Sequence, residues 1–156
     1  MQIHHLYISP GHNFYGHHGL PPDDHEMLEL DEVDCVASKG LQGDRFFDYK
    51  PDYKGQVTFF SMEVHERLQE LLGKTYSPSS YRRNIVVSGV DLNGLIGMEF
   101  EVGGVRFSGS CEAAPCYWME QAIAEGAEEA MKGNGGLRAK ILSDGVLERS
   151  PSVVGA

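Results

Sequence analysis

Two cysteines, Cys111 and Cys116, lie five positions apart in the stretch CEAAPCYWMEQ, and a proline directly precedes the second one. Such a pair can form a disulfide, supply half of a metal site, or contain one reactive thiol. A closed zinc site needs four ligands, and the third cysteine, Cys35, falls in a predicted strand. A disulfide here would close only a short loop, and an odd number of cysteines is typical of free thiols in a reducing compartment. We therefore expect no structural zinc and favour a thiol.

Cys116 is the better candidate for a reactive thiol. Pro115 suits the first turn of a helix, where its missing N–H would have no partner in any case. Cys116 would then lie in the same turn, and the positive end of the helix would stabilise its thiolate and lower its pKa. The competing interpretation is an inert buried cysteine, and for Cys111 a place in the core is equally open.

Four arginines fall at the ends of predicted elements instead of along helix faces. A guanidinium beside glycine-rich backbone suits recognition of phosphate or carboxylate groups. The alternative is that each one forms a surface ion pair with the many carboxylates of the chain. Asp44 is expected to orient the arginine that follows it or to cap its loop. These arginines are Arg45, Arg82, Arg83 and Arg138.

A histidine-rich segment near the N-terminus is the other candidate for metal binding. Imidazoles and carboxylates together can bind zinc, nickel or iron, but no HxxxH spacing defines a geometry here. We expect solvated or hydrogen-bonded loop histidines, with a metal site as the alternative. The residues concerned are His12, His17, His18, His25, Asp23 and Asp24.

Composition limits the class of protein. The chain has 156 residues and 41% hydrophobic residues, which predicts one domain over 1–156. Its net charge is −10, so nucleic acid or a membrane surface is not an expected partner. No apolar run approaches the roughly 18 residues of a membrane span, and MQIHHLYISP does not resemble a signal peptide. These features favour the cytoplasm.

The local patterns indicate a mainly β fold with two or more helices, in the form of a closed or half-closed barrel. Gly103-Gly104 predicts a hairpin that places Glu101 opposite Arg106. Residues 11–27 read as a long loop or arm that could wrap a second copy in a homodimer. Strands are expected at 2–10, 29–38, 56–60 and 81–90, as a hairpin over 98–110, and as two strands around Asp144-Gly145 within 137–148. One helix is expected between the cap Ser61 and Gly73, because apolar residues follow Ser61 at helical spacing, and a second is expected after Cys116. The apolar residues are Val64, Leu68, Leu71 and Leu72 in the first helix and Met119, Ile123, Ala127 and Met131 in the second.

An ordered series of motifs resembles the MOSC domain, which is named after the C-terminal part of molybdenum cofactor sulfurases. The series consists of GLQGDRFF, QVTFFSMEVHERL, RRNIVVSGVDLNGLIGMEFEVGGVRFSGS, APCYWM and GLRAKILSDG. The arm HNFYGHHG also resembles a subgroup of small stand-alone bacterial members. The resemblance implies a β-rich barrel and a cysteine that carries sulfur as a persulfide or ligates the molybdenum of a pterin cofactor.

The resemblance also assigns site residues. Cys116 matches the proline-cysteine position of the family, and Asp44 and Arg45 match its Gly-Asp-Arg. Arg83 and Asn84 match its Arg-x-Asn region loosely, since the arginine directly precedes the asparagine. Arg138 is added because it follows a glycine pair. The family is also associated with pyridoxal phosphate binding.

Two classes of function follow. In the first, the chain transfers sulfur to a metal centre, or reduces N-hydroxylated compounds at molybdenum, with a sulfur donor or a reductase as partner. In the second, it is a non-catalytic module that binds an anionic ligand, such as a pterin, or a partner protein. The sequence leaves open whether the chain is an enzyme.

Overall fold

The computed structural model describes residues 1–10, 27–116 and 118–150. Within these residues, a seven-stranded sheet has the order β2-β1-β6-β5-β9-β8-β7 and a three-stranded sheet has the order β10-β3-β4. The large sheet contains β1 (Gln2–Ile8), β2 (Leu28–Leu30), β5 (Val57–Ser61), β6 (Ile85–Ser88), β7 (Glu99–Val102), β8 (Val105–Glu112) and β9 (Leu137–Ile141). The small sheet contains β3 (Glu32–Val36), β4 (Gly40–Leu41) and β10 (Gly145–Glu148).

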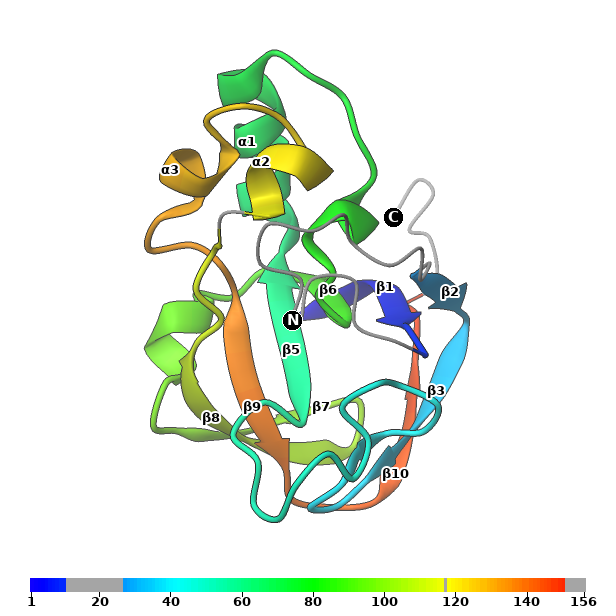
Figure 1. Cartoon of the computed structure of the whole chain (residues 1–156). Helices are drawn as coiled ribbons and strands as arrows, with labels where there is room; N and C mark the ends of the chain where they lie inside the picture. Colours follow the sequence, from blue (N-terminus) through cyan, green and yellow to red (C-terminus); the bar gives the residue numbers. More distant parts are fainter. Residues whose placement is uncertain (11–26, 117, 151–156) are drawn as a thin grey trace, which may run out of the picture.

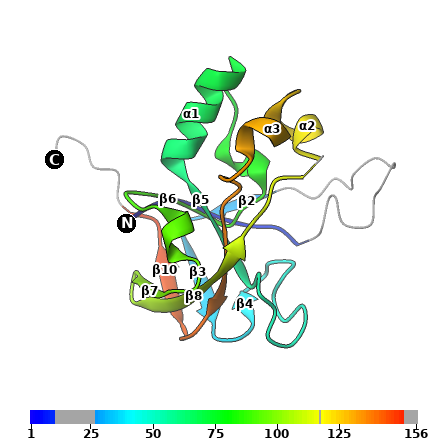
Figure 2. The ribbon, with the colours of Figure 1, turned by 90° about the vertical axis from the view of Figure 1, so that its left-hand side faces the viewer.

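The helices gather at one end of the molecule, and most of the strands lie below them (Figures 1 and 2). They are α1 (Met62–Leu72), α2 (Trp118–Ala122) and α3 (Ala127–Met131), with the 3₁₀ turn η1 (Pro78–Tyr81) packed against α2. A second 3₁₀ turn, η2 (Leu92–Leu95), packs against β5, β8 and β9 instead. The two sheets enclose one apolar core without closing into a barrel, which confirms the half-closed form of the prediction. None of the helices in the described ranges has the length and apolar character needed to span a bilayer.

A second core lies between the large sheet and the helices. Because side chains alternate along a strand, Val57 and Phe59 of β5 belong to the inner core, whereas Phe60 packs in the outer core with Leu68 of α1. Thr58, like Phe60, therefore points to the outer, helical side of the sheet. This outer face carries the candidate site described below.

The predicted hairpin is confirmed in its turn and its register. Gly103 and Gly104 both have positive φ, 56° and 84°, as a tight hairpin turn requires. Phe100 pairs with Phe107, and Glu101 lies opposite Arg106. The guanidinium of Arg106, however, forms its ion pair with Glu99, at 2.6 Å.

The caps of α1 are also as predicted. Ser61 Oγ accepts a hydrogen bond from the backbone N–H of Val64 at 3.2 Å, and Gly73 ends the helix in the left-handed region. Leu68 is buried, and Val64 and Leu72 pack against the same core. Leu71, although it also follows at helical spacing, is 67% exposed and lies outside this apolar stripe.

Two predicted elements are divided in the structure. The strand expected at 29–38 bends at Asp31 into β2 and β3, which belong to different sheets. The helix expected to follow Cys116 is two short helices, α2 and α3. The carboxylate of Glu120 accepts hydrogen bonds from the N–H groups of Gly126 and Glu128, both at 3.1 Å. This side chain starts α3 separately, although the predicted apolar positions remain buried.

The predicted arm and its histidine-rich metal site fall almost wholly on residues 11–26, which lie outside the described residues. The homodimer expected from that arm therefore stays a prediction, as does the single domain over 1–156.

Asn84 joins three strands through its buried side chain. Its Oδ1 accepts hydrogen bonds from the N–H and the hydroxyl of Thr58, both at 3.0 Å. Its Nδ2 donates to the carbonyl of Tyr7 at 3.1 Å, and the residue is 0% exposed. Asn84 therefore holds β1 and β5 at the start of β6, and its amide points into the protein instead of toward a ligand.

Replacing Asn84 with alanine should lower the free energy of unfolding by about 2–4 kcal/mol, because buried polar partners lose their hydrogen bonds. Urea denaturation measures this change. Asn93→Ala, which removes one exposed hydrogen bond to the carbonyl of Gly133, should cost less than about 1 kcal/mol. Equal stability of the Asn84→Ala variant and the parent chain would contradict this structural role.

Candidate functional site

Cys116 lies on the surface as a free thiol, just before α2. It is not inside the first turn of a long helix, as the sequence suggested, because α2 begins at Trp118 and has five residues. The other two cysteines are also free: Cys111 is half-buried and Cys35 is 2% exposed. Burial, with a smaller contribution from the charge of Asp34, raises the pKa of Cys35 to about 12. Of the three thiols, Cys116 is the one that solvent reaches most easily.

Arg83 holds the segment that leads to this thiol. Its Nε donates to the carbonyl of Gly135 at 2.8 Å, and its Nη1 donates to the carbonyl of Tyr81 at 3.0 Å. Its Nη2 donates to the carbonyls of Ala113 and Ala114, at 2.7 and 3.4 Å. The guanidinium thus bridges the segment before Cys116 and the loop before β9.

Two glycines allow these segments to meet. A Cβ on Gly135 would lie 2.2 Å from the carbonyl oxygen of Ala113 and 2.8 Å from Pro115. A Cβ on Gly136, whose φ is +108°, would lie 2.4 Å from the carbonyl oxygen of Phe59. All three distances are too short for a Cβ atom, so only glycine fits at either position. The glycine pair, noticed in the sequence because it precedes Arg138, therefore lets the Cys116 segment pack against the loop.

The pKa of Arg83 shows which charges surround it. Burial lowers this pKa to about 10, the charge of Cys116 raises it, and the charges of Arg138 and Arg45 lower it further. Cys116, Arg45 and Arg138, from distant parts of the chain, thus lie near enough to Arg83 for their charges to act on its guanidinium.

Asp44 and Arg45 form a buried framework beside this group. Asp44 Oδ1 accepts hydrogen bonds from the N–H of Ser9 at 3.0 Å and from Nη1 of Arg45 at 3.1 Å. Nη2 of Arg45 donates to the carbonyl of Arg82 at 3.0 Å. Burial lowers the pKa of Arg45, and the adjacent charge of Asp44 opposes that change. As the sequence indicated, Asp44 orients Arg45 and caps its loop, here through the N–H of Phe46.

Arg138 differs from the other arginines. In β9 it lies between Thr58 of β5 and Cys111 of β8, so its side chain projects from the outer face of the sheet. We find no hydrogen bond or ion pair of its guanidinium within the ranges that the structure describes. Arg138 is therefore the arginine of this group that is available to an anion.

Arg82 was grouped with the other three arginines in the sequence, but the family resemblance assigned it no site role. Its Nη2 donates to the hydroxyl of Ser9 at 2.9 Å, and the residue is buried next to Arg45. A signal for it exists, because Arg82 precedes Asn84 by two positions and so fits an Arg-x-Asn spacing better than Arg83 does. Among the described residues, no cluster of three or more histidine, cysteine or acidic side chains could hold a metal ion.

Replacing Arg83 with glutamine should destabilise the protein by about 3 kcal/mol, because several carbonyls lose a charged donor. Arg138→Gln removes the same charge without losing a contact among the described residues. It should change the free energy of unfolding by less than about 0.5 kcal/mol. Urea denaturation of the two variants tests the difference, and equal effects would contradict it.

The fold is similar to three crystal structures, at sequence identities that establish the fold alone. The YuaD protein from Bacillus subtilis aligns with a TM-score of 0.74 at 18% identity, over 94% of this chain and 90% of that one. YiiM from Geobacillus stearothermophilus aligns with a TM-score of 0.68 at 14% identity, over 94% and 70%. YiiM from Escherichia coli aligns with a TM-score of 0.63 at 15% identity, over 95% and 66%.

The sequence itself identifies the family. No curated protein matches the chain significantly. The model of the MOSC domain matches residues 17–149, which span most of the sequence and include Cys116, the arginine group and every strand except β1. The chain therefore belongs to the MOSC domain family.

Proposed function

We propose that the protein is a sulfur carrier of the MOSC family and that Cys116 is its working thiol. The observation that carries this proposal is an exposed sulfur in the segment that Arg83 holds through the carbonyls of Ala113 and Ala114. Thiolates are the nucleophiles and the leaving groups of sulfur exchange. Exposure allows a donor and an acceptor to reach the same atom.

In the proposed reaction, the Cys116 thiolate attacks the terminal sulfur of a donor persulfide. A new S–S bond forms on Cys116 while the S–S bond of the donor breaks, and the electron pair of that bond leaves on the donor thiolate. Transfer to an acceptor thiolate repeats this exchange in the opposite direction, so neither half requires an external oxidant or reductant. The fixed backbone around Arg83 holds the segment that presents Cys116 to both partners.

Binding of a molybdenum–pterin cofactor is the second candidate role of the same thiol. Cys116 would supply one soft ligand, which suits a metal whose other ligands come from the pterin. Arg138, with an uncommitted guanidinium, would hold an anionic group, whereas Arg45 and Arg83 already donate to other protein atoms and would contribute charge alone. Asp44 and Asn84 would support this site from the protein interior. When bound, such a cofactor supplies the redox chemistry that reduces N-hydroxylated compounds.

The open setting of Cys116 favours transfer between proteins over a closed reaction chamber. A polar cleft around the first turn of α1 and η2 lies elsewhere and borders the loop before β9. A sulfur donor and an acceptor in the cytoplasm are the partners that this reading requires. A non-catalytic binding module would need no nucleophilic sulfur at Cys116.

The three thiols should react at very different rates with iodoacetamide. Cys116 should be modified first in the folded protein, whereas Cys35 should react only on unfolding, because its pKa is about 12 and its side chain is buried. Peptide mass mapping after short labelling at pH 7.5 gives the order. Repeating the labelling over a range of pH measures the titration of Cys116. Modification of Cys35 ahead of Cys116 would contradict the structure.

Incubation with glutathione persulfide should add one sulfur atom to Cys116, and cyanide should remove it as thiocyanate. Mass spectrometry of the intact protein and of its peptides locates this atom. Cys116→Ser should abolish the loading, whereas the control Cys35→Ser should keep it. Arg138→Gln should retain the loading as well.

The cofactor alternative is distinguished in the same preparation. Co-expression with molybdenum cofactor synthesis, followed by metal and pterin analysis, should yield little molybdenum if the chain is a sulfur carrier. Stoichiometric molybdenum that is lost in Cys116→Ser would favour the cofactor instead. If Cys116→Ser changes neither sulfur loading nor metal content, the proposed role of this thiol is wrong.

A further inference from the structure

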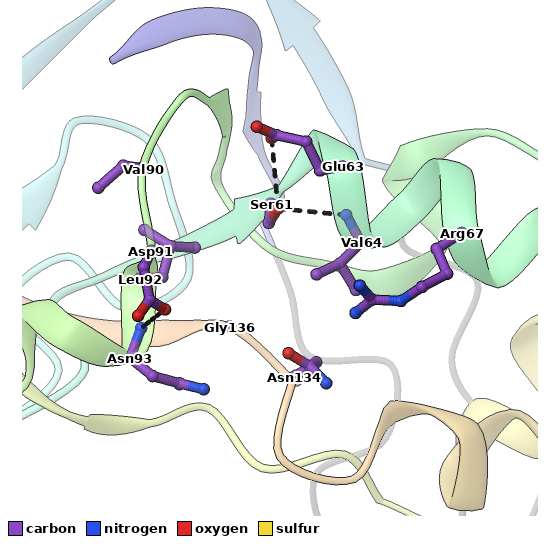
Figure 3. A pocket seen from close by; sticks show the side chains of 10 residues that line it. All are labelled: Ser61, Glu63, Val64, Arg67, Val90, Asp91, Leu92, Asn93, Asn134 and Gly136. Carbon is purple, nitrogen blue, oxygen red and sulfur yellow. Dashed lines mark hydrogen bonds between the residues drawn. The ribbon is translucent and has the colours of Figure 1, made fainter.

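A polar cleft of about 240 Å³ borders the loop that precedes β9, at Asn134 and Gly136. It is formed by the end of β5, the first turns of α1, the η2 segment and the residues before β9 (Figure 3). Drug-sized ligands occupy pockets of about 300–1,000 Å³, so this cleft suits a smaller molecule. Apart from Gly136, its lining residues play no part in the proposed sulfur transfer.

One side of the cleft presents donors. Figure 3 shows the guanidinium of Arg67 and the amide of Asn134 directed into the space between α1 and the loop. Neither side chain has a hydrogen bond or ion pair among the residues that the structure describes. The cleft also reaches Ser61 and Val64, where α1 begins, and the positive end of an 11-residue helix adds a preference for negative charge. This side is complementary to a carboxylate.

The other side carries one uncommitted acceptor. Oδ1 of Asp91 accepts the hydrogen bond that caps η2, from the N–H of Asn93 at 3.2 Å. Within the described ranges, Oδ2 of Asp91 accepts no hydrogen bond. Figure 3 places this carboxylate across the cleft from Arg67. It is complementary to an ammonium group.

The second acidic residue of the cleft is already committed. Glu63 Oε2 accepts a hydrogen bond from the N–H of Gly89 at 2.9 Å, and this bond is the main cause of the lowered pKa of Glu63. Its carboxylate points away from Arg67 in Figure 3. Asp91 is thus the carboxylate that remains to meet a ligand.

A ligand with a single charge would be opposed by one side of the cleft. A simple anion would be attracted by Arg67 but repelled by Asp91. A simple cation would be attracted by Asp91 but repelled by Arg67. A small zwitterion satisfies both sides at once. We propose that this cleft binds a free α-amino acid, with its carboxylate at Arg67 and Asn134 and its ammonium group at Asp91.

The experiment uses the full chain and free amino acids. Each of the twenty L-amino acids is screened for chemical-shift changes in the amide spectrum of the ¹⁵N-labelled protein. At least one should bind with a dissociation constant below ~10 mM, which corresponds to a weak but specific ligand. Shifts should centre on the first turn of α1, η2 and the loop at 132–136. If no amino acid binds in this range, the proposal is wrong.

Single-charge derivatives of the best ligand test the zwitterion itself. The methyl ester removes the carboxylate charge, and the N-acetyl derivative removes the ammonium charge. Each should bind at least tenfold more weakly than the parent amino acid. Equal binding of either derivative would overturn the assignment.

Matched variants test the two sides of the cleft. Arg67→Gln and Asp91→Asn should each weaken binding at least tenfold, and Asn at position 91 can still cap η2. The controls Lys54→Gln and Glu70→Gln remove exposed charges outside the cleft and should leave affinity unchanged. Cys116→Ser should also bind normally, so this result is independent of the sulfur-transfer proposal. Unchanged affinity in Arg67→Gln or Asp91→Asn would show that the ligand lies elsewhere.

Discussion

The candidate site depends on the way Arg83 is accommodated. A guanidinium cannot lose its charge in the protein and must find partners for its donors when it leaves water. Here the partners are backbone carbonyls from η1, from the segment before Cys116 and from the loop before β9. The need to satisfy one cation therefore fixes the position of three chain segments. One of these segments leads directly to the exposed sulfur of Cys116.

This arrangement explains how a protein with a net charge of −10 maintains a local group of arginines. Asp44 neutralises part of the charge, and carbonyl dipoles solvate the rest. Arg45 and Arg83 are consequently structural cations whose field extends beyond their hydrogen bonds. Arg138, which projects from the outer face of the sheet, is the member of the group whose guanidinium makes no hydrogen bond or ion pair among the described residues.

Much of the fold could be predicted because its determinants are local. The glycine pair at 103–104 determines the turn of a hairpin, and Ser61 and Gly73 are the caps of α1. Each of these signals can be recognised from a few neighbouring residues. The divided elements were missed because their cause is tertiary: β2 and β3 separate at Asp31 to join different sheets, and the Glu120 side chain starts a new helix. Hydrophobic spacing alone did not reveal either change.

The site was predictable in its side chains but not in its construction. Motif resemblance led to Cys116, Arg45 and Arg83, and a preceding glycine pair led to Arg138; the charges of Cys116, Arg45 and Arg138 all act on Arg83. The sequence does not predict whether the guanidinium of an arginine donates its hydrogen bonds to a ligand or to the protein itself. Arg83 meets Ala113 and Gly135 across separations of 30 and 52 residues, and the acceptors are main-chain atoms with no residue signature.

The acceptors of Arg83 also bear on how such proteins diverge. Since the arginine recognises the path of the backbone, a change of side chain at an exposed position such as Ala114 leaves the recognised atom in place. Selection on this region would then act on one arginine and on glycines that admit no side chain, and would leave the neighbouring positions free to drift. Two descendants of one ancestor could keep the same sulfur-presenting scaffold after most of their aligned letters had changed.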